Sequence, residues 1–523
     1  MRLSELLESI TLIDSINQND VEIDKIAYHS GEVESGTLFV CIKGYQTDGH
    51  EYATKAVEQG AAALVVERFI PDLDVPQYKV ENSRQALAAL GDRYYDHPSK
   101  DFTVIGITAT NGKTSTSFMT NSILEENKLN TGLIGTVMVK YGKTVVPSVL
   151  TTPESLDLHG YFAKMRQENI SHVTMEVSSS ALDLSRVGNV DFDIVALNNI
   201  SREHIDLHGS FEEYYNAKAS LIREAGSGQF AVLNLDDDYS ASLISQTEAN
   251  VVTYGLKDDS GHLYCSDLDI ASGRGSFRVE VRKPFKTITG RTIEQTSFRI
   301  DLSVAGYHSV YNAMAAVTIG LISGVDIETI QSGISNFKGV ERRFQFIYEN
   351  DFKIVDDHFA NAGNIDVTLE TLTKMDYKTL HIVYAIRGSR GVTTNRENAE
   401  ALAKWAPKLG LEKVIVSLSE SHVIDKDDVL PEELEAFKEE MDKVGVEIEL
   451  HKEMPDALQS SLKQVQKGDV ILLGGAQGMD FGAKYILHQL VEMRPELDKE
   501  SVLKPLTQRV AGIDESFLDK ERK

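Results

Sequence analysis

The most informative stretch of the sequence reads Phe102-Thr-Val-Ile-Gly-Ile-Thr-Ala-Thr-Asn-Gly-Lys-Thr-Ser-Thr116. An apolar, β-branched run leads into a turn with glycine and lysine, and an amphipathic pattern from about Ser115 to Asn127 follows it. Strand, tight loop and helix N-terminus in this order can hold a phosphate, because backbone N–H groups and the helix dipole converge on the anion. Lys113 can reach the β- and γ-phosphates, and the hydroxyl of Thr114 or Ser115 can join a Mg²⁺ shell. The stretch predicts an ATP- or GTP-binding domain, which alone could serve a kinase, a ligase or a motor.

Apolar runs of this kind alternate with helix-length amphipathic segments over most of the chain, which is typical of βαβ units and parallel sheets. The runs that we expect to form strands are 102–108, 172–177, 192–197, 230–234, 352–355, 380–384, 413–417 and 469–473. Between 263 and 302 a period-two pattern with glycine-rich turns predicts a small antiparallel insertion. Polar joints at 94–101 and 337–343 mark two boundaries. We therefore expect an α/β protein of three domains, residues 1–100, 101–338 and 339–523, with the phosphate loop in the central one.

The composition excludes several classes of protein. The 523 residues carry 53 Lys and Arg against 80 Asp and Glu, a formal net charge of −27, which disfavours non-specific binding to nucleic acid or an anionic membrane. Two distant cysteines, Cys41 and Cys265, make neither a disulfide framework nor a zinc cluster and fit a reducing compartment. No apolar stretch approaches the roughly 18 residues of a membrane span, and the N-terminus lacks a secretory-signal pattern. We expect a soluble cytoplasmic protein with no nucleic-acid partner and no membrane span.

Two further polar motifs follow predicted strands and should face the same edge of the sheet as the phosphate loop. One is Met175-Glu-Val-Ser-Ser-Ser180, and the other is Asn198-Asn-Ile-Ser-Arg-Glu-His-Ile-Asp-Leu-His-Gly209. Ligands of open parallel sheets bind at the carboxyl ends of strands, so Glu176 and His204 are expected beside the loop. A carboxylate and an imidazole next to a triphosphate suit a second divalent ion. Lys218 lies one helix further on and, taken alone, has the pattern of a solvated helix lysine.

Taken together, these motifs resemble those of the Mur ligase family. Ala109-Thr-Asn-Gly-Lys-Thr114, Thr151-Thr-Pro153 and the motifs around Glu176 and His204 occur in the order and spacing of that family. The resemblance covers residues 23–350 and, more thinly, the rest of the chain. It is greatest to the UDP-N-acetylmuramoyl-L-alanyl-D-glutamate ligases, the MurE group. It implies a smaller N-terminal α/β domain that binds the UDP-sugar, a central P-loop-type ATPase domain with a parallel sheet, and a Rossmann-like C-terminal domain that binds an amino acid.

The resemblance also implies a reaction and its substrates. A carboxylate of a UDP-muramoyl-peptide attacks the γ-phosphate of ATP to give an acyl phosphate and ADP. The amine of an amino acid then attacks the acyl carbon and phosphate leaves, which extends a peptidoglycan precursor. Two Mg²⁺ ions and Lys113 would neutralise the negative charge that develops.

The family pattern further implies roles for single residues. The implied catalytic residues are Lys113, Glu176, His204 and Lys218, and the implied metal ligands are Thr114, Glu176, His204 and Lys218. Lys218 would be the N-carboxylated lysine of the family. The implied ATP-binding residues are Thr110, Asn111, Gly112, Lys113, Thr114, Ser115, Asn312, Arg343 and Asp356. The implied substrate-binding residues are Ser30 and His50 for the UDP-sugar, and Thr151, Thr152, Ser178 and Arg186 for the muramoyl-peptide portion.

The sequence departs from the family pattern mainly in the C-terminal domain. Earlier replacements are Ala109 for a glycine, Ser180 for a histidine and Gly31 for an arginine. Phe359 stands at a histidine position, with His358 one place earlier, whereas Arg390 is kept. Where diaminopimelate-adding members have Asp-Asn-Pro-Arg, this chain has Leu418-Ser-Glu-Ser-His422, and the later Gly-Lys-Gly-His-Glu motif reads Gly475-Ala-Gln-Gly-Met-Asp480. The sequence therefore leaves the identity of the added amino acid open.

Three alternatives stand beside this interpretation. The chain could be a divergent ligase for another carboxylate and amine, a non-catalytic relative that binds a nucleotide sugar and ATP, or a protein with folylpolyglutamate-synthase-like activity. The non-catalytic relative is disfavoured because it would have no need of the intact set Lys113, Thr114, Glu176, His204 and Lys218. The N-terminal uridine-type segment argues against the folylpolyglutamate synthase.

Overall fold

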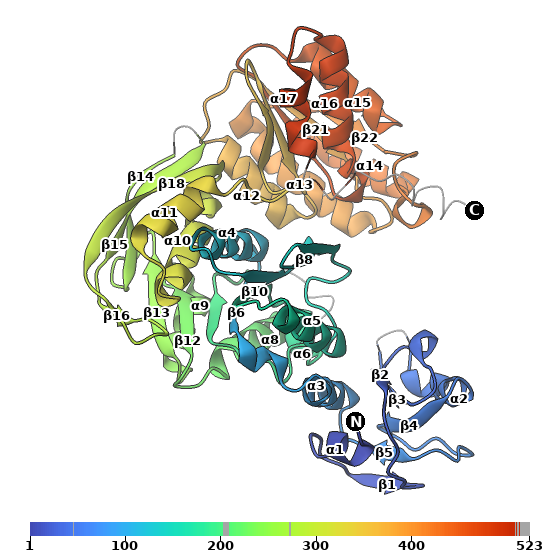
Figure 1. The fold of residues 1–523 in the computed structure, drawn as a ribbon. Coiled ribbons are helices and arrows are strands. Elements are labelled where there is room, and N and C mark those ends of the chain that lie inside the picture. Colours follow the sequence, from blue (N-terminus) through green and yellow to red (C-terminus); the bar gives the residue numbers. More distant parts are fainter. Residues whose placement is uncertain (45–46, 202–208, 271–272, 508, 510–511, 513–523) are drawn as a thin grey trace. The chain divides into compact units, whose positions relative to one another are not determined.

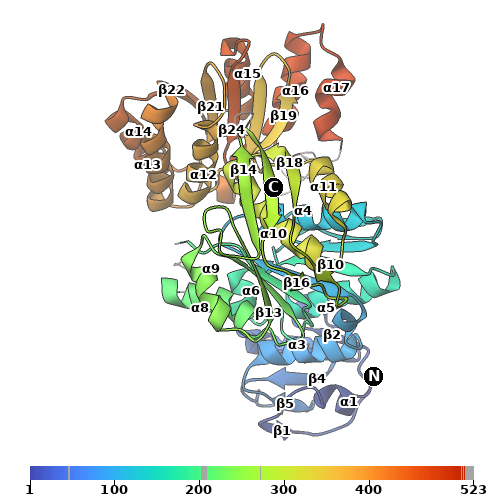
Figure 2. The same cartoon turned by 90° about the vertical axis from the view of Figure 1, so that its left-hand side faces the viewer.

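The computed structural model describes residues 1–44, 47–201, 209–270, 273–507, 509 and 512 (Figure 1, Figure 2). Its contacts divide the chain into two compact units. The first unit comprises 1–262, 283–294 and 315–326, and the second comprises 263–282, 295–314 and 327–523. Both units are built from mixed or parallel sheets with helices, so the predicted α/β class is confirmed.

The N-terminal part of the first unit is a five-stranded sheet in the order β1-β5-β4-β3-β2. Its elements are α1 (Leu3–Leu7), β1 (Asp14–Ile16), β2 (Lys25–Ala27), β3 (Thr37–Val40), α2 (Ala53–Glu58), β4 (Ala61–Val66), β5 (Gln77–Lys79) and α3 (Ser83–Tyr94). Strand β1 pairs antiparallel with β5, and the other neighbours are parallel. Leu38 and Val40 pack into one core, whereas Phe39 and Cys41 pack into another, because parallel strands covered on both faces bury every side chain.

The central sheet of the first unit has the order β13-β12-β11-β6-β10-β7-β8-β9. Its strands are β6 (Thr103–Thr108), β7 (Thr131–Ile134), β8 (Met138–Tyr141), β9 (Thr144–Pro147), β10 (His172–Glu176), β11 (Ile194–Leu197), β12 (Phe230–Asn234) and β13 (Asn250–Gly255). The strands from β13 to β7 are parallel, and β8 and β9 continue the sheet as an antiparallel hairpin. The main helices here are α4 (Lys113–Glu126), α5 (Ser155–Gln167), α6 (Ser179–Asp183) and α8 (Phe211–Arg223). Strands β11, β6, β10 and β7 are parallel neighbours. The segments that follow these four strands therefore lie at the same edge of the sheet.

Polar contacts with the start of α5 join the N-terminal part of the first unit to the central sheet, one from Tyr28 after β2 and one from Arg84 of α3. The Tyr28 hydroxyl donates to Asp157 over 2.6 Å, and Arg84 pairs with Glu154 over 3.1 Å. Burial raises the pKa of the Asp157 carboxyl.

The stability of the fold should depend on pH through histidines that are buried or partly buried. Burial lowers the pKa of His159, His172, His262, His308 and His358 below the ordinary value of 6.5. The unfolded chain then binds more protons than the folded one in mild acid, so the free energy of unfolding falls as the pH drops below about 6.5. We expect a lower calorimetric Tm at pH 5.5 than at pH 7.5, and a smaller difference in a His159→Gln variant. An unchanged Tm over this range would contradict the burial of these rings.

The second unit contains an antiparallel segment and a six-stranded sheet. Strands β14 (Leu263–Asp269), β15 (Arg274–Val281) and β18 (Thr296–Ala305) pair antiparallel, which confirms the insertion predicted between 263 and 302. The sheet has the order β19-β20-β24-β21-β22-β23, and only the pair of β19 with β20 is antiparallel. Its strands are β19 (Gln345–Glu349), β20 (Lys353–Asp357), β21 (Leu380–Ala385), β22 (Lys413–Ser417), β23 (Glu447–His451) and β24 (Val470–Gly474).

Helices cover both faces of this six-stranded sheet. One hydrophobic core includes Leu369, Leu402 and Phe437 from α12 (Ala362–Leu372), α13 (Val392–Leu409) and α14 (Pro431–Val444). A separate core includes Leu458 and Ile486 from α15 (Met454–Gln464) and α16 (Gly482–Met493), and the two groups of helices can be followed in Figure 2. The remaining helices of the second unit are α11 (Ile327–Asn336) and α17 (Lys499–Leu503), and α10 (Tyr307–Ile322) precedes α11. Among the helices that the structure describes, none has the length and apolar character to cross a membrane.

Candidate functional site

The phosphate loop lies where β6 ends and α4 begins. Gly112 has a φ of +91°, a left-handed conformation that glycine adopts without strain, and the helix begins at the next residue. The Lys113 Nζ donates hydrogen bonds to the carbonyl oxygens of Ala109 (2.8 Å) and Thr110 (3.1 Å). The loop therefore combines a positive side chain with the N-terminal end of a 14-residue helix, an arrangement that suits an anion.

Residues after β11 and on α8 hold this loop in place, and they were not predicted from the sequence. The Asn199 side chain accepts from the Asn111 backbone N–H (3.0 Å) and donates to the Asn111 carbonyl (2.8 Å). The Thr110 hydroxyl lies 2.9 Å from the Tyr214 hydroxyl and accepts from the Ser201 backbone N–H over 2.9 Å. The sequence contains one signal for this role. Asn199 stands two residues after β11, and a side-chain amide there can bond a backbone N–H and a carbonyl of a neighbouring loop at once.

Glu176 ends β10 with a fully buried carboxylate. The Thr114 hydroxyl donates to Oε2 over 2.9 Å, which joins this carboxylate to the phosphate loop. Thr136 donates its backbone N–H to Oε1 (2.8 Å) and its hydroxyl to Oε2 (3.0 Å). Gly135 permits this approach, since a Cβ at that position would lie 2.2 Å from Oε1. Thr136 was not predicted, although a Gly-Thr pair directly after the strand Thr131–Ile134 is a recognisable signal.

Lys218 is buried, unlike a solvated helix lysine. Ser210 begins α8 by accepting from the backbone N–H of Glu213 over 3.1 Å, and Lys218 on this helix is 1% exposed. Its Nζ donates to the Ala109 carbonyl over 2.8 Å, the same oxygen that accepts from Lys113. The structure thus brings two lysine side chains to one carbonyl of the phosphate loop.

Three of the predicted muramoyl-peptide residues lie beside Glu176. The Thr152 hydroxyl donates to the Glu176 carbonyl (2.9 Å) and accepts from the Ser178 backbone N–H (3.1 Å). The Thr151 hydroxyl lies 3.1 Å from the Thr136 hydroxyl. These threonines follow the β8–β9 hairpin, so the hairpin brings a second set of hydroxyls to the carboxyl end of β10.

Arg186 belongs to the same edge of the central sheet. Its Nη1 donates to the Thr152 carbonyl over 3.4 Å, and its Nη2 lies 2.9 Å from the Glu154 carboxylate. Arg84 of α3 lies 3.1 Å from the other oxygen of Glu154. Two arginines thus flank one carboxylate, which leaves one positive charge in excess at this edge of the sheet.

The two residues predicted to bind the UDP-sugar lie in short 3₁₀ helices between the strands of the N-terminal sheet. Ser30 begins a short 3₁₀ helix and is 9% exposed. The His50 ring is buried, with Nδ1 2.6 Å from Asp48 and Nε2 accepting from the Glu67 backbone N–H over 2.9 Å. Because both ring nitrogens are engaged, a direct contact of His50 with substrate requires one of these bonds to break.

The remaining predicted ATP-binding residues, Asn312, Arg343 and Asp356, belong to the second unit. Asn312 is buried on α10, and Asp356 is fully buried near the end of β20. Asp356 accepts a hydrogen bond from Arg509, and its Oδ1 lies 3.7 Å from the Nε of Arg342. Burial lowers the pKa of Arg342 to about 10. Arg342, the residue before the predicted Arg343, therefore lies beside Asp356.

His204 lies within 202–208, outside the described residues, so its position relative to Glu176 stays a prediction. Within the described ranges, no group of three or more His, Cys, Asp and Glu side chains could hold a metal ion. The oxygen donors of Thr114 and Glu176 still fit Mg²⁺, which commonly uses one or two carboxylates together with phosphate and water oxygens.

Phe359, at the family's histidine position, is part of a hydrophobic core. The side chain is 1% exposed, its backbone has a φ of +48°, and its ring centroid lies 5.9 Å from that of Tyr384. A Cβ on Gly474 would lie 2.7 Å from the Phe359 ring, so the end of β24 is shaped around this side chain. The neighbouring His358 has a pKa lowered to about 2 by burial, so its ring is neutral.

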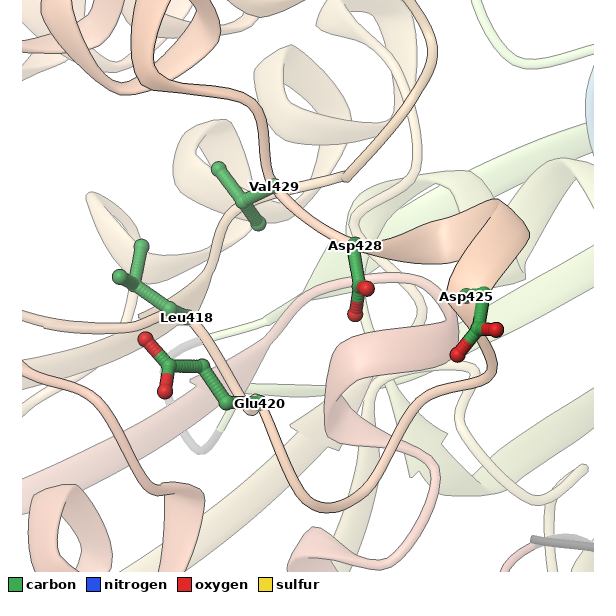
Figure 3. A pocket seen from close by; sticks show the side chains of 5 residues that line it. All are labelled: Leu418, Glu420, Asp425, Asp428 and Val429. Atoms are coloured by element: carbon green, nitrogen blue, oxygen red, sulfur yellow. The ribbon is translucent and has the colours of Figure 1, made fainter. Parts of the chain in front are cut away.

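A cavity of about 500 Å³ lies at the carboxyl end of β22, where this chain has Leu418–His422 in place of the Asp-Asn-Pro-Arg motif. Its lining residues are Leu418, Glu420, Asp425, Asp428 and Val429, and Figure 3 shows them on two facing segments of chain. The charged side chains of this lining are all carboxylates.

Comparison with known proteins agrees with this architecture. Three family models match: the Mur ligase family catalytic domain at residues 22–95, the Mur ligase middle domain at 107–320, and the Mur ligase glutamate ligase domain at 342–477. The chain is 35% identical over 487 residues to the UDP-N-acetylmuramoyl-L-alanyl-D-glutamate–2,6-diaminopimelate ligase of Bacillus velezensis, covering 91% of this chain and 94% of that protein.

Solved structures share the fold. A structure of a UDP-N-acetylmuramoyl-L-alanyl-D-glutamate–2,6-diaminopimelate ligase has a TM-score of 0.65 and 21% identity, covering 92% of this chain and 95% of the other. The MurF ligase of Thermotoga maritima in complex with ADP has a TM-score of 0.60 and 21% identity, covering 92% and 98%. With the sequence match over nine-tenths of both proteins, these findings show that the chain belongs to the Mur ligase family.

Proposed function

We propose that this protein is an ATP-dependent ligase that joins an amino acid to UDP-N-acetylmuramoyl-L-Ala-D-Glu through an acyl phosphate, in the cytoplasm where ATP is available. The observation that carries the proposal is one connected set of groups at the edge of the central sheet. Hydrogen bonds link the hydroxyl of Thr114 to the Glu176 carboxylate, and this carboxylate through Thr136 to Thr151. Thr152 bonds the Glu176 carbonyl, and Lys113 bonds two carbonyls of the phosphate loop that contains Thr114. The relatives described above carry the corresponding activity in their names.

We assign different parts of the reaction to different residues at this edge of the sheet. The phosphate loop, residues 110–115, would bind the triphosphate, and Thr151, Thr152, Ser178 and Arg186 would hold the muramoyl-peptide so that its carboxylate faces the γ-phosphate. The Lys113 ammonium would stabilise the charge on the transferred phosphoryl group. We assign the UDP end to residues 1–100, including Ser30 and His50, and the amino acid to residues 339–523. We also assign ATP binding to Asn312, Arg343 and Asp356, on the resemblance to the family.

Two Mg²⁺ ions are the proposed cofactors of this reaction. Thr114, Glu176, His204 and a carboxylated Lys218 would hold them. When bound, the ions supply positive charge that offsets the charge of the phosphates and of the attacking carboxylate.

We propose that Lys218 is N-carboxylated: its amine adds to CO₂, one proton leaves, and a carbamate anion remains. The position of Lys218 supports this, since its Nζ is buried between the Ala109 carbonyl, at 2.8 Å, and the Tyr214 ring, whose centroid is 5.0 Å away. The Lys113 ammonium bonds the same carbonyl, so two positive charges repel here, whereas a carbamate would attract Lys113 and any cation.

The cavity at Leu418–Val429 bears on the choice of amino acid. Carboxylates at this position repel the second carboxylate of diaminopimelate and attract a side chain that ends in an ammonium group. These groups are exposed, so each contributes at most about 1 kcal/mol. We therefore expect lysine or ornithine to have a KM several-fold lower than that of diaminopimelate.

The experiment is an ADP-release assay with UDP-N-acetylmuramoyl-L-Ala-D-Glu, ATP, Mg²⁺ and a panel of amino acids. We expect release only when all components are present, with a cationic amino acid preferred. ATP binding without turnover for any amino acid would contradict the proposal and favour a different carboxylate or a non-catalytic role. A clear preference for diaminopimelate would contradict only the role of the acidic cavity.

A further inference from the structure

Thr136 connects two parts of the site. Its backbone N–H holds Oε1 of Glu176 at 2.8 Å, and its hydroxyl donates to Oε2 at 3.0 Å. The same hydroxyl lies 3.1 Å from that of Thr151, where either oxygen could be the donor. A row of hydrogen bonds therefore runs from the proposed muramoyl-peptide residue Thr151 to the proposed metal ligand Glu176.

We propose that Thr136 is a positioning residue that couples metal binding at Glu176 to binding of the muramoyl-peptide at Thr151, and this inference rests on the proposed function. A hydroxyl has one proton to donate. While that proton points to Glu176, the Thr151 hydroxyl must donate to Thr136 to make the 3.1 Å bond. Thr151 then has no proton left for a substrate oxygen.

If Glu176 held a divalent cation, its carboxylate would accept less strongly from the Thr136 hydroxyl, and the Thr136 proton could turn to Thr151. The Thr151 proton then becomes available to an anionic oxygen of the substrate. The backbone N–H of Thr136, fixed directly after β7, keeps Oε1 in place meanwhile. Cation and substrate therefore favour the same arrangement, which is positive coupling between their binding sites.

The experiment measures binding, not turnover. The Mg²⁺ dissociation constant is determined by titration calorimetry in the presence of a non-hydrolysable ATP analogue, with and without saturating UDP-N-acetylmuramoyl-L-Ala-D-Glu. In the wild type we expect the substrate to lower this Kd about tenfold, within the usual range of coupling between sites. Thr136→Val should bring the ratio close to one, and Thr136→Ser, which keeps the hydroxyl, should retain it.

Two further variants separate coupling from folding. Thr131→Val removes a hydroxyl from β7, the strand that precedes Thr136; this hydroxyl bonds Glu125 (3.2 Å), so the variant should leave the ratio unchanged. Thr151→Val breaks the other end of the row and should also abolish the coupling, so the inference stays testable if Thr136→Val is unstable. The same ratio in wild type and Thr136→Val, or its loss in Thr136→Ser, would overturn the inference. A wild type that shows the coupling but releases no ADP would instead contradict the proposed function.

Discussion

Replacing Lys113 with alanine should reduce ADP release by about 10³-fold or more, to the background of the assay. The ammonium lies inside the phosphate loop, bonded to the Ala109 and Thr110 carbonyls, so a triphosphate there meets it directly. Phosphoryl transfer depends on groups that stabilise charge in the transition state, and no other predicted ATP-binding side chain of the loop carries a positive charge. Lys113→Arg should not restore activity, because a planar guanidinium does not fit a site built around an ammonium.

The matched control is Lys143→Ala, which removes an exposed lysine from the turn between β8 and β9. This variant should keep the wild-type rate. Unchanged circular dichroism and Tm for Lys113→Ala would show that the loss is chemical. If Lys113→Ala kept a tenth or more of the wild-type turnover, the assignment of the phosphate loop would be wrong.

The second large effect is expected at Lys218. Lys218→Ala should lower turnover about 10²–10³-fold, the loss typical when one charge-stabilising group is removed. Added formate, acetate or propionate should restore part of the rate, because a small carboxylate can enter the space left by the buried side chain and replace the carbamate. Rescue is measured as ADP release against carboxylate concentration, at constant ionic strength.

Small amines provide the opposing test for Lys218. If the residue acts as a free ammonium, methylamine or ethylamine should rescue the variant and carboxylates should not. Rescue by amines alone, or no rescue in a variant with a normal Tm, would contradict N-carboxylation. Lys113→Ala should respond to neither class of compound, which makes it a control for non-specific activation.

Much of the fold could be predicted from the sequence. Strands such as Phe230–Asn234 and Lys413–Ser417 have the predicted bounds, because short apolar runs between helical segments define buried parallel strands. The predicted start of α4 was wrong. The helix begins at Lys113 and not at about Ser115, because Gly112 allows the chain to turn directly into the helix.

The residues of the candidate site could be predicted where they belong to a local sequence motif. They could not be predicted where their position depends on tertiary packing. Lys113, Thr114 and Glu176 lie within a local motif, and the structure brings them together. Thr136 and Tyr214 carry no motif, since their roles come from neighbouring strands and from the fold of α8 over the loop. Lys218 has the pattern of a surface lysine, and only tertiary packing shows that it is buried.

The central claim, ligation through an acyl phosphate, is tested most directly by isotope transfer. UDP-N-acetylmuramoyl-L-Ala-D-Glu carrying ¹⁸O at both oxygens of the reacting carboxylate is turned over with ATP, Mg²⁺ and the preferred amino acid, and the released phosphate is analysed by mass spectrometry. Attack of the carboxylate on the γ-phosphate followed by attack of the amine on the acyl carbon must leave one carboxylate oxygen in each phosphate. We predict one ¹⁸O per phosphate released, together with one ADP and one amide product. Phosphate without ¹⁸O would contradict the account.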